Sequence, residues 1–252
     1  MATFILVHGG AHGGWCWDAV VHRLTTAGHR AFAPDLPGMG TDRTPPKDVT
    51  LEMTGSFIAS LARCQPEKVV LVGHSLGGIT ISDAAERAPE AIAGLVYVTA
   101  VLLPSGAAAM GTLKNTGKLP PWISLSNDGA TVSVDPDYAR ERFYNGCNEV
   151  DVTSALARLV PQPTRLMFDQ LTHTPERFGA IPRAYIECLN DNALALDVQR
   201  SQQAMLPCRP VFTMQTGHSP FIQAPEALTA HLIAAAAALG LRRGPHQSRS
   251  ET

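Results

Sequence analysis

The stretch KVVLVGHSLGG, residues 68–78, constrains the fold more strongly than any other part of the chain. It opens with four consecutive apolar residues, Val69 to Val72, three of which are β-branched. An unbroken apolar run of this kind is typical of a strand buried on both faces, as in a parallel sheet. Glycines follow at positions 73, 77 and 78, before a segment that fits a helix. The stretch therefore predicts a strand, a tight turn and a helix in direct succession.

The same alternation runs through most of the chain. Strands are expected at residues 3–8, 30–33, 68–75, 92–100, 182–188 and 210–216, and helices at 17–27, 51–64, 76–87, 196–206 and 225–239. Buried strands that alternate with helices form a parallel sheet covered on both faces. We therefore predict an α/β fold with a six-stranded, mostly parallel sheet and helices on both faces.

Residues 101–180 interrupt this alternation with prolines, polar turns and only short helical pieces, at 138–145 and 152–159. Sheets of this kind bind ligands outside the carboxyl ends of their strands, so a segment inserted between two strands can cover that edge. We expect residues 1–100 and 181–241 to form one core, residues 101–180 to form a lid, and the polar segment 242–252 to be a disordered tail.

Composition and charge exclude several classes of function. The chain is 45% hydrophobic and 17% charged with a net charge of −2, so it has no basic footprint for nucleic acid. No apolar run approaches the roughly 18 residues of a membrane span, and the start of the chain lacks the pattern of a secretion signal. Five scattered cysteines without a C-x-x-C pair favour the reducing cytoplasm. We expect a cytoplasmic enzyme with a small-molecule substrate, without membrane or nucleic-acid partners, as a monomer or homodimer.

The most specific motif is Gly-His-Ser-Leu-Gly at residues 73–77, which matches G-x-S-x-G. In this motif a serine occupies a sharp turn between a strand and a helix, so that its hydroxyl projects from the sheet. The flanking Gly73 and Gly77 lack the Cβ atoms that would collide where strand and helix approach. The alternative is a glycine-rich turn with an incidental serine. The predicted strand before the motif and helix after it favour Ser75 as a nucleophile.

From residue 3 to residue 240 the chain resembles the α/β-hydrolase family. The likeness is to the branch that contains plant methylesterases of the salicylate-binding type, hydroxynitrile lyases and bacterial esterases such as pyrethroid hydrolases. It rests on the segments LVHGGAHGGWCW, PDLPGMGTD, VVLVGHSLGG, AYIECLNDNALALDVQR and TGHSPFIQAPEAL. In the lid the resemblance extends only to size and position. The resemblance implies an α/β-hydrolase fold and a Ser-His-Asp triad.

A serine hydroxyl needs a base, and in this fold the base follows the acid along the chain. His218 lies in TGHSP, directly after the last predicted strand, where a base can approach Ser75. The other histidines late in the chain are placed less well: His173 belongs to the lid, His231 to the last helix and His246 to the tail. The alternative for His218 is a loop histidine in solvent.

The acid should follow the strand at 182–188, where Glu187, Asp191 and Asp197 are available. Glu187 lies within the strand and Asp197 in the next helix, whereas Asp191 lies on the loop between them. Asp191 also aligns with the acid of the family. Its alternative role is that of a turn or helix-capping residue. The strand at 92–100 is followed by no carboxylate, so the acid position that some relatives use there is empty.

The glycine-rich loop HGGAHGG after the first strand has two possible functions. One is an oxyanion hole, with backbone N–H donors from Leu76 and, by resemblance, Gly10. The other is a dinucleotide loop, which requires G-x-G-x-x-G. Neither Gly9 nor Gly10 opens that pattern, although Asp35 could mimic its ribose ligand. We favour the oxyanion loop.

Metal and cofactor chemistry are not expected. His8 and His12 have the spacing H-x-x-x-H, but the loop is not helical and no third ligand is evident. A structural role for His8 and a pocket-lining role for His12 are simpler interpretations. Serine–histidine hydrolases need neither a metal nor an organic cofactor.

The resemblance leaves the reaction open, because the family includes lyases. In the lyases of this branch a threonine, a cysteine and a lysine stand where this chain has Gly10, Leu76 and Ser219. All three positions depart from the lyase pattern, so the sequence favours ester hydrolysis. The alternatives are a lyase or another non-hydrolytic tailoring enzyme on the same fold, or a small-ligand binding protein with low turnover.

The substrate itself is indicated only weakly. We expect His12, Trp122, Phe143 and Phe221 to line the substrate pocket, although aromatic residues of the lid could equally pack its own small core. No basic cluster marks a site for a carboxylate or phosphate. The expected substrate is therefore a small, neutral, lipophilic ester.

Overall fold

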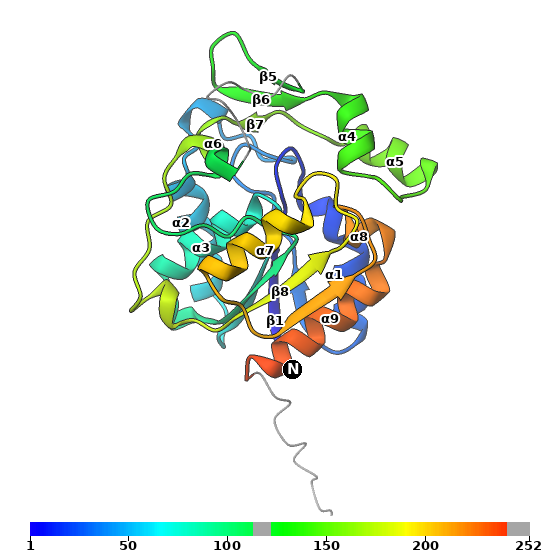
Figure 1. The fold of residues 1–252 in the computed structure, drawn as a ribbon. Helices are drawn as coiled ribbons and strands as arrows, with labels where there is room; N and C mark the ends of the chain where they lie inside the picture. The colour runs from blue at the N-terminus through cyan, green and yellow to red at the C-terminus, as the bar shows by residue number, and fades with distance from the viewer. Residues whose placement is uncertain (113–121, 241–252) are drawn as a thin grey trace, which may run out of the picture.

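The computed structural model describes residues 1–112 and 122–240 (Figure 1). The predicted tail, residues 242–252, lies outside the described residues. The central sheet has six parallel strands in the order β2-β1-β3-β4-β8-β9. These strands are β1 (Thr3–Val7), β2 (Arg30–Phe32), β3 (Val69–His74), β4 (Ile92–Val98), β8 (Arg183–Cys188) and β9 (Val211–Met214). The predicted six-stranded α/β architecture is confirmed, and every strand pair of the sheet is parallel.

Helices cover both faces of the sheet (Figure 1). They are α1 (Asp18–Thr26), α2 (Leu51–Arg63), α3 (Gly77–Arg87), α7 (Leu196–Met205), α8 (Pro220–Gln223) and α9 (Pro225–Ala238). Short 3-10 turns lie at Gly14–Trp17, Pro46–Asp48, Pro89–Ala91, Ala109–Thr112 and Phe178–Ala180.

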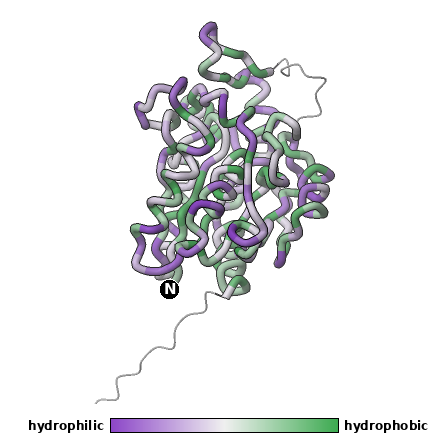
Figure 2. Tube along the Cα trace, turned by 90° about the vertical axis from the view of Figure 1, so that its left-hand side faces the viewer, coloured by the Kyte–Doolittle hydropathy of each residue, from purple (hydrophilic) through white to green (hydrophobic). Residues whose placement is uncertain are grey.

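Two apolar cores, one on each face, explain why the strands read as unbroken apolar runs. Along β1, Ile5 and Val7 pack in the core that contains residues of α2 and α3, whereas Phe4 and Leu6 pack with residues of α1 and α9. Successive side chains of a strand point to opposite faces, so both sets must be apolar. Figure 2 shows hydrophobic stretches running through the body of the molecule and a hydrophilic turn at the tip of the lid.

The strand order reverses between β1 and β3. From β1 the chain goes to β2 on one side and then returns to β3 on the other. In open α/β sheets such a reversal leaves a crevice at the carboxyl ends of the two strands, where ligands bind. The glycine loop after β1 and the turn at Ser75 after β3 both lie at this crevice.

The segment predicted as a lid contains a small sheet that the sequence analysis missed. Its elements are β5 (Ile123–Leu125), β6 (Thr131–Val134), β7 (Gln162–Pro163), α4 (Pro136–Arg142), α5 (Glu149–Leu156) and α6 (Arg165–Phe168). The strands β5, β6 and β7 pair antiparallel and are too short for a periodicity signal. The Asp128-Gly129 pair at the β5–β6 turn, where Gly129 has φ +71°, was the signal that could have found it. The division into core and lid stays a prediction.

Candidate active site

Ser75 occupies a strained turn between β3 and α3. Its φ is +49°, a left-handed conformation that residues other than glycine rarely adopt. Its carbonyl accepts a hydrogen bond from Val101 N at 2.9 Å, which helps to hold this conformation. A Cβ on Gly77 would lie 2.8 Å from the Val7 carbonyl oxygen, and one on Gly73 would lie 2.8 Å from the Gly77 carbonyl oxygen. Glycine at both positions is therefore required for the close approach of strand and helix.

A chain of hydrogen bonds connects Ser75 to His218 and Asp191. His218 Nε2 lies 3.0 Å from Ser75 Oγ, and His218 Nδ1 lies 2.7 Å from Asp191 Oδ2. His218 and Asp191 are buried, and His218 follows β9 while Asp191 follows β8. The buried His74 donates from Nε2 to the His218 carbonyl at 2.7 Å and so fixes the loop that carries His218. The structure thus brings together three side chains predicted from separate segments.

Asp191 has all its acceptor positions occupied. Its Oδ1 accepts from the backbone N–H groups of Ala193 and Leu194 at 2.7 and 2.8 Å. Its Oδ2 accepts from His218 and also from Thr99 Oγ1. Thr99 is fully buried, has φ +38°, and follows β4, the position where the sequence analysis found no carboxylate. A hydroxyl at this position supports the acid in place of a second carboxylate.

We expect Thr99→Val to lower kcat about tenfold, because it removes a hydrogen bond to the Asp191 carboxylate while keeping the side-chain shape. Thr99→Ser keeps the hydroxyl and should retain activity within about threefold. Steady-state kinetics on a chromogenic ester measure both, and near-UV circular dichroism checks the fold. Equal losses in the two variants would show that the hydroxyl does not support Asp191.

The other acidic candidates have structural partners. Glu187, in β8, pairs with Arg200 at 3.1 Å, and Asp197 lies in the first turn of α7. Asp35, considered as a possible ribose ligand, accepts from Gly14 N at 2.7 Å and from both the N–H and the hydroxyl of Thr41. Asp35 therefore ties the glycine loop to the turn that follows β2.

His8 holds the glycine loop in place through hydrogen bonds. His8 Nε2 accepts from Leu36 N at 3.1 Å, so Nδ1 carries the proton and donates to the Gly9 carbonyl at 2.9 Å. The Gly9 carbonyl and the Gly10 N–H belong to one trans peptide unit and point in opposite directions. Holding the carbonyl therefore fixes the direction of the Gly10 N–H. Leu76, which carries the second predicted donor, is the N-cap of α3 and lines the same pocket as Gly10.

Three buried histidines near the site are held neutral. Burial lowers the pKa of His12 to about 3, even though its hydrogen bond to the Gly10 carbonyl acts in the opposite direction. Burial also lowers the pKa values of His8 and His74. His12 donates from Nδ1 to the Gly10 carbonyl at 2.7 Å and accepts from the Tyr144 hydroxyl at 2.9 Å. His12 thus connects the lid to the glycine loop.

These lowered pKa values predict a loss of stability on acidification. Between pH 6.5 and about 3 the unfolded chain binds a proton at His12 and the folded chain does not, so stability falls as pH falls. The contribution of His12 is about 1.4 kcal/mol per pH unit at full slope. The free energy of unfolding is measured with urea at several pH values between 7 and 4.5. The slope of this free energy against pH gives the number of protons taken up on unfolding, and His12→Gln should lower that number by about one. The control is His22→Gln, which changes an exposed histidine and should leave the slope as in wild type. An unchanged slope in His12→Gln would contradict the lowered pKa of His12.

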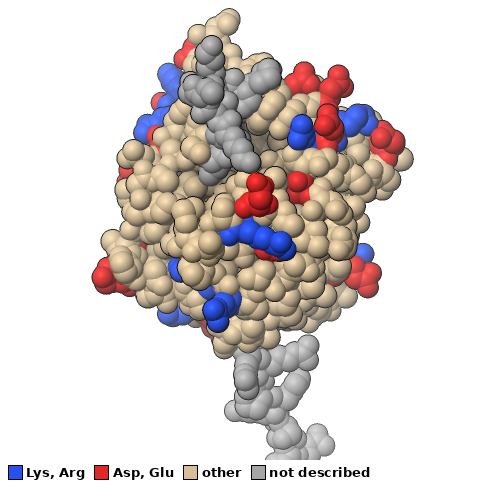
Figure 3. Space-filling view, in the orientation of Figure 1, with Lys and Arg blue, Asp and Glu red and all other residues tan. Residues whose placement is uncertain are grey.

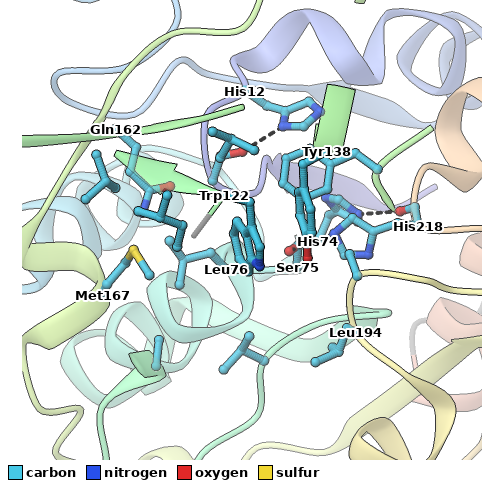
Figure 4. A pocket seen from close by; sticks show the side chains of 18 residues that line it. His12, His74, Ser75, Leu76, Trp122, Tyr138, Gln162, Met167, Leu194 and His218 are labelled. Atoms are coloured by element: carbon cyan, nitrogen blue, oxygen red, sulfur yellow. Dashed lines mark hydrogen bonds between the residues drawn. The ribbon is translucent and has the colours of Figure 1, made fainter. Parts of the chain in front are cut away.

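The pocket above Ser75 is mainly apolar and takes its walls from both the core and the lid (Figure 4). Of the predicted contacts, His12, Trp122 and Phe143 line it. Trp122 stacks on Tyr138 with ring centroids 4.1 Å apart. Sequence reasoning missed several lining residues from distant segments, namely Val101, Gln162, Met167 and Leu194.

Phe221 needs a correction. The structure places it behind the site and not in the pocket, because its ring is enclosed by the rings of His74 and Trp17 at 4.8 and 5.3 Å. It is 1% exposed and belongs to the apolar core on the α1 and α9 side of the sheet. It supports His74 and does not offer a surface to substrate.

The exterior carries charged side chains of both signs. Figure 3 shows Lys and Arg side chains interspersed with Asp and Glu over one face of the molecule. Within residues 1–112 and 122–240, no helix has the length and apolar character needed to cross a membrane.

Comparison with known proteins identifies the family. A sequence model of the Alpha/beta hydrolase family matches residues 4–231. The chain belongs to the α/β-hydrolase family. Methylesterase 2 of Arabidopsis thaliana is 33% identical over 92% of this hydrolase and 95% of its own length. Salicylic acid-binding protein 2 of Nicotiana tabacum is 32% identical over 79% of this hydrolase and 83% of its own length.

The structural neighbours agree with this assignment. The crystal structure of a pyrethroid hydrolase from Sphingobium faniae has a TM-score of 0.83 and 30% identity, covering 94% of this hydrolase and 98% of that chain. The predicted α/β-hydrolase fold and the resemblance to methylesterases and pyrethroid hydrolases are confirmed. With such relatives, the chain is an ester-cleaving hydrolase.

Proposed function

We propose that this hydrolase is a carboxylesterase that cleaves small, neutral, lipophilic esters through Ser75, His218 and Asp191. The observation that carries the proposal is the hydrogen-bonded series Ser75–His218–Asp191 at the floor of an apolar pocket. In such a series the histidine removes the serine proton and the buried carboxylate orients the imidazole and stabilises its cationic form.

The first half of the reaction forms an acyl-enzyme. Ser75 Oγ attacks the ester carbonyl carbon while its proton passes to His218 Nε2. The N–H groups of Gly10 and Leu76 stabilise the negative charge that develops on the carbonyl oxygen. The tetrahedral intermediate then collapses, the bond to the alcohol oxygen breaks, and His218 gives its proton to the leaving alcohol.

The second half releases the acid. Water gives a proton to His218 Nε2 and attacks the acyl carbon, the bond to Ser75 Oγ breaks, and the serine recovers its proton from His218. The enzyme ends in its starting state, with one alcohol and one carboxylic acid as products. Apart from the substrate and water, the reacting groups are side chains and backbone N–H groups of the chain. We place the enzyme in the cytoplasm, as the cysteine pattern suggests.

Isotope labelling tests this proposal against the alternatives. With ethyl butyrate in H₂¹⁸O, hydrolysis puts one ¹⁸O into the butyrate and none into the ethanol, because water attacks the acyl carbon. Mass spectrometry of both products measures this. If neither p-nitrophenyl esters nor alkyl esters yield measurable ¹⁸O-labelled acid, the result would instead favour a binding protein or a non-hydrolytic enzyme.

A further inference from the structure

Gln162, on β7, is the pocket residue whose chemistry the reaction leaves unused. It is 5% exposed and lines the pocket together with apolar side chains of the lid, including Ile123, Val132 and Met167. Its carboxamide makes no hydrogen bond to another side chain or backbone group in residues 1–112 and 122–240. Its amide atoms are not sealed within the protein but face the open space of the pocket, where a ligand could bind them.

The carboxamide faces the oxyanion loop. A Cβ on Gly10 would overlap Gln162 Oε1, and it would lie 3.6 Å from Leu76 Cδ2. The Gln162 side chain therefore lies against the residues that carry the two proposed oxyanion donors. A substrate whose carbonyl oxygen binds these donors is therefore placed next to the Gln162 side chain.

The position of His218 restricts which part of the ester can lie near Gln162. His218 must protonate the leaving alcohol, so the alcohol part lies on its side of Ser75. In Figure 4, Gln162 and Met167 lie on one side of Ser75 and His218 lies on the other. The acyl chain leaves the carbonyl carbon in another direction than the alcohol oxygen, and the side of the pocket that holds Gln162 is open to it.

We infer that Gln162 is a specificity-determining residue that hydrogen-bonds a polar oxygen on the acyl chain. The substrate class is then narrower than lipophilic esters in general: the acyl group carries a carbonyl or hydroxyl oxygen within an otherwise apolar chain. The carboxamide can donate to either and accept from a hydroxyl. This inference rests on the proposed esterase function, and it names the substrate of that same site.

The kinetic test varies residue and substrate together. We would measure kcat/KM for ethyl hexanoate and its 3-oxo, 4-oxo and 5-oxo analogues with wild type, Gln162→Leu and the control Met167→Leu. Gln162→Leu should lower kcat/KM at least fivefold more for one of the oxo esters than for ethyl hexanoate. Met167→Leu changes only an apolar wall and should affect all four alike. A uniform loss in Gln162→Leu, or no loss, would overturn the inference.

Two further measurements separate this inference from the esterase proposal. Calorimetry of the preferred oxo ester should show weaker binding to Ser75→Ala/Gln162→Leu than to Ser75→Ala, by at least fivefold, without any turnover. Gln162→Leu should also melt at or above the wild-type temperature, because it breaks no hydrogen bond to the described residues and places an apolar side chain among apolar neighbours. Equal binding by the two Ser75 variants, or a lower melting temperature, would contradict a ligand-binding role. Absence of turnover in wild type would sink the esterase proposal alone.

Discussion

Ser75→Ala is expected to lower kcat/KM for p-nitrophenyl butyrate by at least ~10³. The substitution removes one oxygen atom and leaves the oxyanion donors, the pocket and His218 in place. Without Oγ no acyl-enzyme can form, and only the residual effect of binding and of the N–H donors remains. The smaller side chain also fits the same turn, so the effect should fall on chemistry and not on folding.

The control for this variant is Ser60→Ala, which removes a hydroxyl from the exposed surface of α2. It should keep wild-type kinetics. Both variants should show the same near-UV circular dichroism as wild type. Wild-type rates in Ser75→Ala would remove Ser75 from the mechanism and leave the proposed reaction without a nucleophile.

Asp191→Asn is expected to lower kcat by roughly 10³ to 10⁴, because an amide in this position favours the wrong tautomer of the histidine. The hydrogen bonds around Asp191 explain why the loss of activity should be large. Asp191 Oδ2 accepts from both His218 Nδ1 and Thr99 Oγ1, and Oδ1 accepts from two backbone N–H groups. Whichever of the two oxygens the NH₂ group of asparagine replaces, that group would face a hydrogen-bond donor and would find no acceptor.

The matched control is Asp197→Asn, the same chemical change six residues further on, in the first turn of α7. It should keep kcat within about twofold. Because Asp191→Asn also disturbs a buried network, its melting temperature should be measured, and kcat should be compared at a temperature where both variants are folded. A large loss in Asp197→Asn with Asp191→Asn active would mean that the acid is misassigned.

The residues that the sequence predicted well are those whose position depends on local pattern and chain order. Ser75 lies between an apolar run and a helix, which fixes its turn. His218 and Asp191 each follow a strand of a parallel sheet, and the carboxyl ends of such strands meet at one edge. Their convergence could therefore be expected without coordinates, although the distances and the burial could not.

The features that the sequence did not predict depend on contacts between distant segments. Thr99 reaches Asp191 across 92 positions of the chain, and its hydroxyl belongs to an otherwise apolar strand end. Gln162 meets Gly10 only because β7 folds over the glycine loop. Phe221 is predicted to line the pocket, but its direction is set by packing against Trp17, which no local pattern encodes.

The most direct test of the central claim is to trap the acyl-enzyme. Wild-type protein mixed with p-nitrophenyl butyrate and quenched with acid within the first turnover should carry one butyryl group. Peptide mass spectrometry should place that group on Ser75, and Ser75→Ala should carry none. Steady ester turnover with a butyryl group on another residue, or with no covalent intermediate in rapid-quench samples, would contradict the account.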